Sequence, residues 1–277
     1  MSRDGLRLSV TLLSIVPGAV IPAFDKNMEG HAPDQPVDPG PAGMGGPSRL
    51  TAGEAMVWAP LVGLVLGVIA AAVLYVSGHL LHTGSLVAAV LAVGTLAVLT
   101  RGLHLDGLAD LADGLGSRRP ADGALAVMRR SDIGPFGVVT LVLVLLIQVA
   151  GLTQADSSGR GVPAVIVAAV TGRLAITWAC RRGVPPARPD GLGAMVADSV
   201  APVAAVLVTA AVLAATVGGI FLAAAVADVP VAVAAGLVAG VSLAEYASRR
   251  LGGITGDVLG AVAETATAAC LLVTAIS

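Results

Sequence analysis

The chain has 277 residues, of which 56% are hydrophobic, 12% charged and 3% aromatic, with a formal net charge of −2 and a mean hydropathy of +0.90. Soluble domains carry roughly twice this share of charge, so the composition excludes an ordinary soluble enzyme and predicts an integral membrane protein. So few aromatic side chains offer almost no surface for base stacking, and we expect no nucleic-acid partner.

The first fifty residues differ from the rest of the chain. Residues 5–23 form a weakly apolar segment with two prolines, so we expect 1–24 to be an interfacial or re-entrant segment. Residues 25–50 are rich in proline, glycine and aspartate, which predicts a disordered loop. Residues 51–277 then form one membrane domain.

Long apolar stretches predict an all-α, polytopic membrane protein with about seven transmembrane helices, the count being open from six to eight. A helix of about 20 apolar residues crosses a bilayer. Stretches of this kind lie at 56–77, 84–100, 134–152, 162–180, 201–226, 229–247 and 257–276. In the first of them, Gly63 and Gly67 are four residues apart, a spacing that permits close helix packing.

Arginines are unevenly distributed among the connections between these stretches. Most of them lie in the connections at 101–133, 181–200 and 248–256, whereas the alternate connections hold only Arg160. Since basic loops stay on the cytoplasmic side, we expect a multi-pass protein of the cell inner (cytoplasmic) membrane, with these three connections inside. The motifs described next all lie on that face, so we expect a cytoplasmic active site in contact with the lipid bilayer.

Three aspartates follow the second apolar stretch, in the run HLDGLADLADGLG at residues 104–116. A helix would place Asp106, Asp110 and Asp113 on one stripe roughly 10 Å long. Three such carboxylates repel one another unless a cation lies among them, and oxygen ligands alone suit Mg²⁺ better than Zn²⁺. We therefore expect these aspartates to bind magnesium and to act in catalysis.

The same aspartates also fit a simpler alternative, a solvated acidic helix that follows a span. Interleaved glycines argue against it, because Gly102, Gly107, Gly114 and Gly116 weaken a helix that needs only solubility. They suit a backbone that approaches a bulky ligand or another helix. Acids and glycines together favour a membrane enzyme that transfers a phosphate-linked group with the help of magnesium.

Four further side chains near the aspartates are candidate site residues. His104 is predicted either to take a proton from an attacking hydroxyl or to donate a hydrogen bond to phosphate, and a structural hydrogen bond is the alternative. Arg129 and Arg130 either bind phosphate oxygens or set the topology, and these roles are compatible. Arg173 lies midway along the 162–180 stretch, where an unpaired arginine costs at least about 2.5 kcal/mol. It needs an acidic or phosphate partner, unless the boundary of the span is misplaced.

A second pair of acids begins the last apolar stretch. Asp257 and Glu264 are seven residues apart, and Arg249 precedes them in the adjoining loop. The spacing places both acids on one helix face, like Asp106 and Asp113. We expect the two acid pairs to form two walls of one site, with Asp257 as a further metal ligand and with Asp257, Glu264 and Arg249 in contact with substrate.

Four motifs carry a resemblance to a known family. They are HLDGLADLADGLG at 104–116, RLGGITGDVLGA at 250–261, WAPLVGLVLG at 58–67 and ARPDGLG at 187–193. Together they resemble the cobalamin synthase family, adenosylcobinamide-GDP ribazoletransferase. The resemblance extends over nearly the whole chain from about residue 56, and its first two motifs are specific.

The resemblance implies a magnesium-dependent transferase late in vitamin B12 assembly. Such an enzyme joins α-ribazole, or its 5′-phosphate, to adenosylcobinamide-GDP and releases GMP. The three aspartates of the first motif match the family's acidic motif, and Asp257 matches the carboxyl-terminal one. Arg130, Ser131 and Asp132 depart from the family pattern, in which the acidic residue comes first, so no role for Arg130 or Asp132 follows from it. The sequence leaves the oligomeric state open.

Two other functions remain as alternatives. A CDP-alcohol phosphotransferase for phospholipids also has spaced aspartates and glycines at a membrane edge, although its motif has Ala-Arg where this chain has Ala112 and Asp113. A cation-coupled transporter would place its carboxylates near mid-membrane on broken helices. In this sequence, the acids lie at the ends of the predicted spans.

Overall fold

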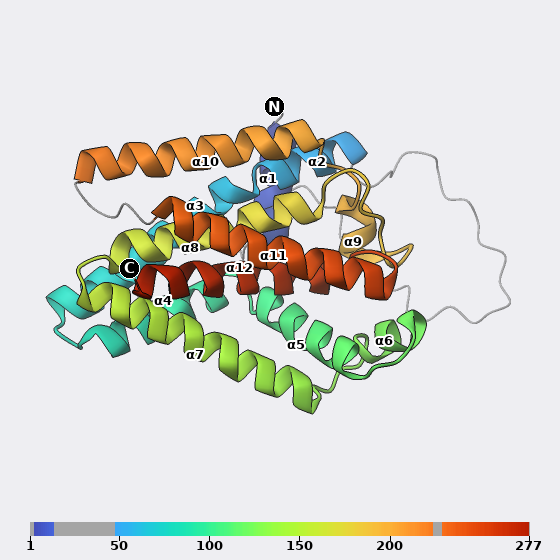
Figure 1. Ribbon diagram of the computed structural model, residues 1–277, viewed down its shortest axis with the longest axis horizontal. Coiled ribbons are helices and arrows are strands. Elements are labelled where there is room, and N and C mark those ends of the chain that lie inside the picture. The colour runs from blue at the N-terminus through green and yellow to red at the C-terminus, as the bar shows by residue number, and fades with distance from the viewer. Residues whose placement is uncertain (1–2, 14–47, 224–228, 277) are drawn as a thin grey trace, which may run out of the picture.

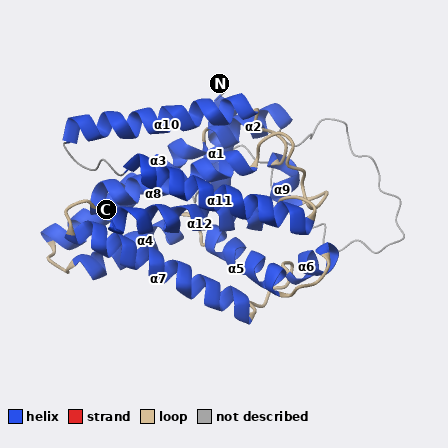
Figure 2. Ribbon diagram, in the orientation of Figure 1, coloured by secondary structure: helices blue, strands red, loops and turns tan. Residues whose placement is uncertain are grey.

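The computed structural model describes residues 3–13, 48–223 and 229–276, and these ranges are helical almost throughout (Figure 1; Figure 2). Within them there is no β-strand, and the β-type pairs are two isolated bridges, Arg181 with Val200 and Pro186 with Ile254. The helices are α1 Arg3–Leu13, α2 Arg49–Val57, α3 Ala59–Tyr75, the π-helix η2 Val76–Leu80, α4 Ser85–Leu99, α5 Leu103–Gly116, α6 Ala121–Val127, α7 Pro135–Ser157, α8 Gly161–Ala179, α9 Gly191–Val196, α10 Pro202–Ala223, α11 Val229–Leu251 and α12 Gly256–Ile276.

Each predicted span coincides with a helix, which confirms the all-α, polytopic class. In the described part of the chain, five segments are long and apolar enough to cross a membrane, namely Arg49–Leu80, α7, α8, α11 and α12. The pair α4 and α5 makes a sixth if it is taken as one broken span. The remaining predicted span, 201–226, corresponds to α10, whose described apolar part, Pro202–Thr216, is shorter.

The break between α4 and α5 is made by two residues with left-handed backbone conformations. Arg101 and Gly102 have φ angles of 55° and 69°, and glycine adopts such an angle without steric cost. The amide of Gly102 donates to the carbonyl oxygen of Ala97 at 2.8 Å, which closes the end of α4. As a result α5 leaves the direction of α4 by 87° and carries the aspartates away from it.

The centre of the bundle is α12, which packs against α5, α7, α8 and α11 (Figure 1). Glycines allow this close packing. A β-carbon on Gly63 would lie 2.6 Å from the carbonyl oxygen of Ala169 in α8, and one on Gly236 would lie 2.7 Å from that of Ala266 in α12. Backbones therefore approach closely at these crossings, as the spacing of Gly63 and Gly67 predicted.

The amino-terminal helix α1 runs across the direction of the longer helices (Figure 1). It packs against α2 and α3, and a β-carbon on Gly5 would lie 2.7 Å from Cβ of Glu54. Most of the predicted disordered loop, residues 25–47, lies outside the described residues. Helix α2 begins after Ser48, whose hydroxyl oxygen accepts a hydrogen bond from the amide of Thr51 at 3.2 Å.

Candidate active site

Two glycines let α5 cross α12 at close range. A β-carbon on Gly107 would lie 2.7 Å from Cα of Asp257, and one on Gly260 would lie 2.9 Å from Cα of His104. Side chains at these positions would separate the two backbones. The crossing therefore brings the start of α12, and Asp257 with it, alongside the aspartates of α5.

Three carboxylates meet at this crossing. Asp106, Asp110 and Asp257 are near enough for each to interact electrostatically with the other two. The hydroxyl of Thr255 donates to Oδ2 of Asp257 at 3.1 Å, and a guanidinium nitrogen of Arg188 lies 3.9 Å from the same oxygen. The start of α12 and the aspartates of α5 thus form an oxygen-rich cluster, with Arg188 beside Asp257.

Asp113 has different surroundings. Its Oδ2 accepts a hydrogen bond from the amide of Gly134 at 2.7 Å, and its Oδ1 accepts one from the amide of Gly137 at 2.9 Å. Both amides belong to the start of α7, where backbone donors have no partner within the helix. The carboxylate of Asp113 is therefore a cap for α7, although Asp113 lies on the same helix as Asp106 and Asp110.

The predicted ligand set of four aspartates is not gathered around one point. Among the residues that the structure describes, no group of three or more His, Cys, Asp or Glu side chains is arranged to hold a metal ion. Asp113 does not join the other three aspartates as predicted, because its two carboxylate oxygens accept hydrogen bonds from α7. Asp106, Asp110 and Asp257 remain near one another and offer oxygen atoms alone, the type of ligand that Mg²⁺ prefers.

Arg188 belongs to this site, although its sequence position predicts only a basic residue in the 181–200 connection. Besides its approach to Asp257, it donates to the carbonyl oxygen of Leu125 at 2.8 Å. Burial lowers the pKa of Arg188, and Arg129 adds to this, whereas Asp257, Asp190 and Asp110 oppose it. An arginine stays protonated under such conditions. The sequence feature that could have indicated a role for Arg188 is its position within the ARPDGLG motif.

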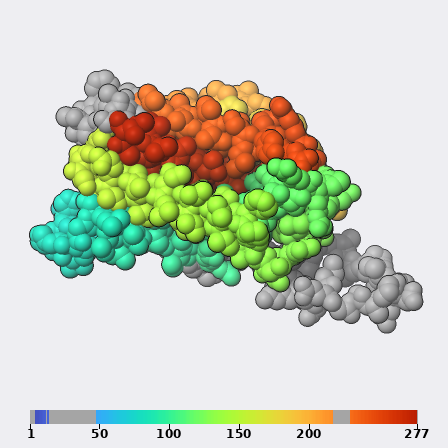
Figure 3. Space-filling view, turned by 60° about the horizontal axis from the view of Figure 1, so that its bottom comes forward, coloured from blue at the N-terminus to red at the C-terminus, as the bar shows by residue number. Residues whose placement is uncertain are grey.

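The other predicted arginines lie at the edge of the site. Arg129 forms an exposed ion pair with Asp190, with 3.3 Å between nitrogen and oxygen. Arg130 lines a cavity together with Asp110, as described below. Arg249 is exposed in the last turn of α11 and lines neither of the two cavities that border the aspartates of α5. Its neighbour Arg250 donates to the carbonyl oxygen of Arg119 at 3.4 Å, where the α5–α6 region adjoins the end of α11 (Figure 3).

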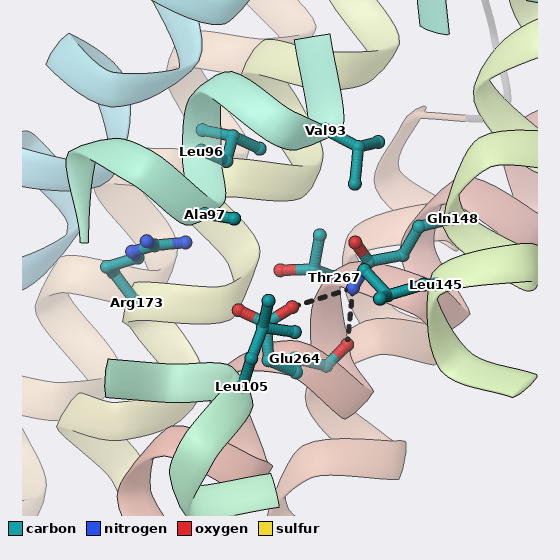
Figure 4. Close-up of a pocket in the computed structure, with 9 residues that line it drawn as sticks. All are labelled: Val93, Leu96, Ala97, Leu105, Leu145, Gln148, Arg173, Glu264 and Thr267. Carbon is teal, nitrogen blue, oxygen red and sulfur yellow. Dashed lines mark hydrogen bonds between the residues drawn. The ribbon is translucent and has the colours of Figure 1, made fainter. Parts of the chain in front are cut away.

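A buried polar cluster lies where α5 begins. Arg173, only 2% exposed, has a guanidinium nitrogen 3.3 Å from Nδ1 of His104. Glu264 Oε1 lies 3.8 Å from the same ring nitrogen, and Gln148 donates to Glu264 Oε2 at 2.8 Å (Figure 4). Arginine side chains only donate, so Nδ1 of His104 accepts this bond and the neutral ring carries its proton on Nε2.

This cluster corrects the expectation that Arg173 and Glu264 line the same site as the aspartates. They border a separate space of about 10 Å³, large enough for roughly one water molecule (Figure 4). The acidic group near Arg173 is Glu264, which interacts with it electrostatically, and its hydrogen-bond partner is His104, which was not predicted. Gln148 was missed, although a lone glutamine within the long apolar run of α7 is itself a signal.

Two cavities border the aspartates of α5. The first, which we call the polar cavity, has a volume of about 260 Å³ and is lined by Asp110, Asp113, Ser117, Arg119, Val127, Arg130, Asp132, Gly134, Pro135 and Phe136. The second, the apolar cavity, has about 210 Å³ and is lined by Leu13, Met56, Leu103, His104, Asp106, Ile176, Leu192, Gly256, Asp257, Leu259 and Gly260. His104 thus connects the buried cluster to the apolar cavity.

Comparison with known proteins gives a consistent family. Residues 36–275 match the family model described as cobalamin-5-phosphate synthase. A Frankia casuarinae protein named adenosylcobinamide-GDP ribazoletransferase is 47% identical over 247 residues, covering 83% of this chain and 87% of the relative. No solved structure matches the chain significantly.

Two further relatives have the same name. The one from a Nocardioides species is 41% identical, with 81% of this chain and 87% of the relative covered. The one from Sinorhizobium medicae is 36% identical, with 79% and 84% covered. The chain therefore belongs to the cobalamin-5-phosphate synthase family, a family of transferases.

Proposed function

We propose that the chain joins α-ribazole, or its 5′-phosphate, to adenosylcobinamide-GDP and releases GMP. The names of its relatives supply the substrate and the transferred group. The observation that carries the proposal is the meeting of Asp106 and Asp110 with Asp257 at the α5–α12 crossing, with Arg188 beside them. Phosphate transfer needs such a combination of carboxylates and cations.

Asp106, Asp110 and Asp257 would hold Mg²⁺, since they offer oxygen donors alone at the boundary of the two cavities. When bound, Mg²⁺ would neutralise the pyrophosphate of the activated corrinoid and the charge of the departing GMP. Arg188 holds Asp257 in place, and Arg130 binds phosphate oxygens from the polar cavity.

The proposed transfer is an in-line displacement at phosphorus. A ribose hydroxyl of α-ribazole forms the new P–O bond to the phosphorus that carries cobinamide, and GMP leaves with the electron pair of the old bond. Asp106 and Asp257 are the groups placed to accept the hydroxyl proton in the apolar cavity. His104 offers Nε2–H, because its Nδ1 faces Arg173, and so acts as a hydrogen-bond donor rather than as the base.

We place the reaction at the cytoplasmic face of the inner membrane. The arginine-rich connections 101–133, 181–200 and 248–256 support this orientation. The aspartates of α5, Arg188 and the start of α12 belong to, or directly adjoin, these connections.

GMP release by detergent-purified protein tests the proposal. With adenosylcobinamide-GDP and α-ribazole we expect GMP to form, to stop when EDTA removes divalent ions, and to return with added Mg²⁺. CDP-diacylglycerol with an alcohol acceptor serves as the control pair. Release of CMP from the control pair, with no GMP from the corrinoid, would replace the proposal by the phospholipid alternative. Solute uptake into proteoliposomes without any chemical product would support a transporter.

A further inference from the structure

Among the residues that the structure describes, the two cavities beside the aspartates share no lining residue. Asp110 lines the polar cavity and Asp106 lines the apolar one. These aspartates are one helical turn apart, about 6 Å along the axis of α5. Groups bound in the two cavities would therefore lie beside neighbouring carboxylates of one helix, which is the arrangement that a reaction between two substrates requires.

The polar cavity suits a phosphate-rich group. Arg119 and Arg130 both line it, and planar guanidinium groups bind phosphate oxygens in pairs. Three acids also line it, namely Asp110, Asp113 and Asp132, and both oxygens of Asp113 accept hydrogen bonds from backbone amides of α7. A nucleoside diphosphate would find donors for its oxygens here.

The apolar cavity has a different lining. Most of its wall is aliphatic, and the side chains come from six helices: Leu13 of α1, Met56 of α2, Leu103 of α5, Ile176 of α8, Leu192 of α9 and Leu259 of α12. Among the residues that the structure describes, its lining contains no lysine or arginine, whereas the polar cavity has two arginines. A diphosphate in this cavity would therefore find no guanidinium group in the lining to bind its oxygens. An uncharged aromatic base would instead bury apolar surface against the leucines, and the hydroxyls of an attached sugar would reach the carboxylates.

We propose that the apolar cavity is the subsite for the aromatic base of the acceptor nucleoside, α-ribazole, and that the polar cavity takes the phosphates of the GDP-activated corrinoid. This assignment rests on the function proposed above. The base lies against Leu192 and Ile176, and the ribose points toward His104, Asp106 and Asp257. The attacking hydroxyl then approaches Asp106, while the phosphates lie one helical turn further along the same face of α5, at Asp110.

Substitutions that fill the apolar cavity test this assignment. Leu192→Trp places a larger ring on α9, and Leu103→Trp does the same from α5, where Leu103 is 52% exposed and has room to change. We expect KM for α-ribazole to rise about tenfold or more in each variant, because the added ring atoms occupy the space of the base. KM for adenosylcobinamide-GDP should stay within about twofold of the wild-type value. Leu86→Trp, at an exposed position at the start of α4, is the matched control and should leave both constants unchanged.

A substitution in the polar cavity should have the opposite effect on the two KM values. Arg130→Gln should raise KM for adenosylcobinamide-GDP about tenfold and leave KM for α-ribazole unchanged, because it removes a phosphate contact alone. Folding of each variant is checked by thermal unfolding in detergent. A folded Leu192→Trp or Leu103→Trp protein that binds α-ribazole normally, or that loses affinity for the corrinoid instead, would overturn the assignment while leaving the enzymatic function intact.

Calorimetric titration of α-ribazole separates this inference from the proposed function. Binding to the wild type that Leu192→Trp weakens about tenfold or more supports the subsite even if no GMP is released, in which case only the proposed reaction fails. If the wild type releases GMP, and the wild type and folded Leu192→Trp bind α-ribazole with equal affinity, the subsite assignment is refuted and the proposed reaction is supported.

Discussion

Asp110 and Asp113 are three residues apart on α5, yet their carboxylates have different surroundings. Asp110 interacts electrostatically with Asp106 and Asp113 of its own helix, with Asp257 across the crossing with α12, and with Arg188. Both carboxylate oxygens of Asp113 accept hydrogen bonds from backbone amides of α7, those of Gly134 and Gly137. Replacing each carboxylate by the amide of the same shape should therefore separate an effect on turnover from an effect on stability.

Asp110→Asn should lower kcat for GMP release by at least about 100-fold, because it removes a charge from the carboxylate cluster while keeping its volume. Thermal unfolding should stay close to that of the wild type. Asp122→Asn, at an exposed acid in the first turn of α6, is the matched control and should keep full activity. Near-normal turnover in Asp110→Asn would remove this residue from the mechanism.

Asp113→Asn should instead lower the stability of the protein. An amide has one acceptor oxygen, so one of the two amides at the start of α7 loses its partner, at a cost of about 1–3 kcal/mol. The midpoint of thermal unfolding in detergent should fall, whereas Asp110→Asn should not move it. Unchanged stability together with lost turnover would show that Asp113 acts as a ligand, as the sequence motif suggested.

At the scale of elements, the site depends on how closely α5 lies against α12. Gly107→Ala introduces a β-carbon 2.7 Å from Cα of Asp257, so the helices must separate. We expect kcat to fall about tenfold or more, since small displacements of reacting groups carry large penalties. Gly94→Ala in α4 meets no atom within 4 Å and should be neutral or slightly stabilising. Equal activity of the two variants would contradict a role for the close crossing.

The elements also show what a sequence can predict. Hydropathy located the helices that correspond to the predicted spans, and the spacing of Asp106 and Asp110 placed both on one face of α5, because both signals are local in the chain. The second member of each predicted acid pair lies elsewhere, Asp113 against α7 and Glu264 in the buried cluster. The predicted span 84–100 ended where the helix does, but the left-handed pair Arg101 and Gly102 and the resulting bend of 87° into α5 were not predicted. Partners distant in sequence were missed as well. Asp113 caps a helix 21 residues on, and Gln148 reaches Glu264 across 116 residues.

The whole molecule has one arginine-rich end, which predicts its orientation. A cysteine at Ser131 should react with a membrane-impermeant maleimide from the cytoplasmic side, and a cysteine at Ser158, in the opposite connection, from the other side. The native Cys180 and Cys270 are buried and should give little background. Labelling of right-side-out and inverted vesicles measures this, and reactivity of both sites from the same side would refute the topology.

The crowded helix crossings have a consequence for how the chain can vary. At Gly63, Gly107, Gly172 and Gly240, an added methyl group would lie less than 3 Å from atoms of a neighbouring helix. In a bilayer, lipid tails are as apolar as leucine, so a bulkier residue there would gain no compensating burial and would only push the helices apart. We therefore expect few substitutions to be tolerated at these inner glycines. Many should be tolerated on the lipid-facing sides of the helices, where one aliphatic residue can replace another.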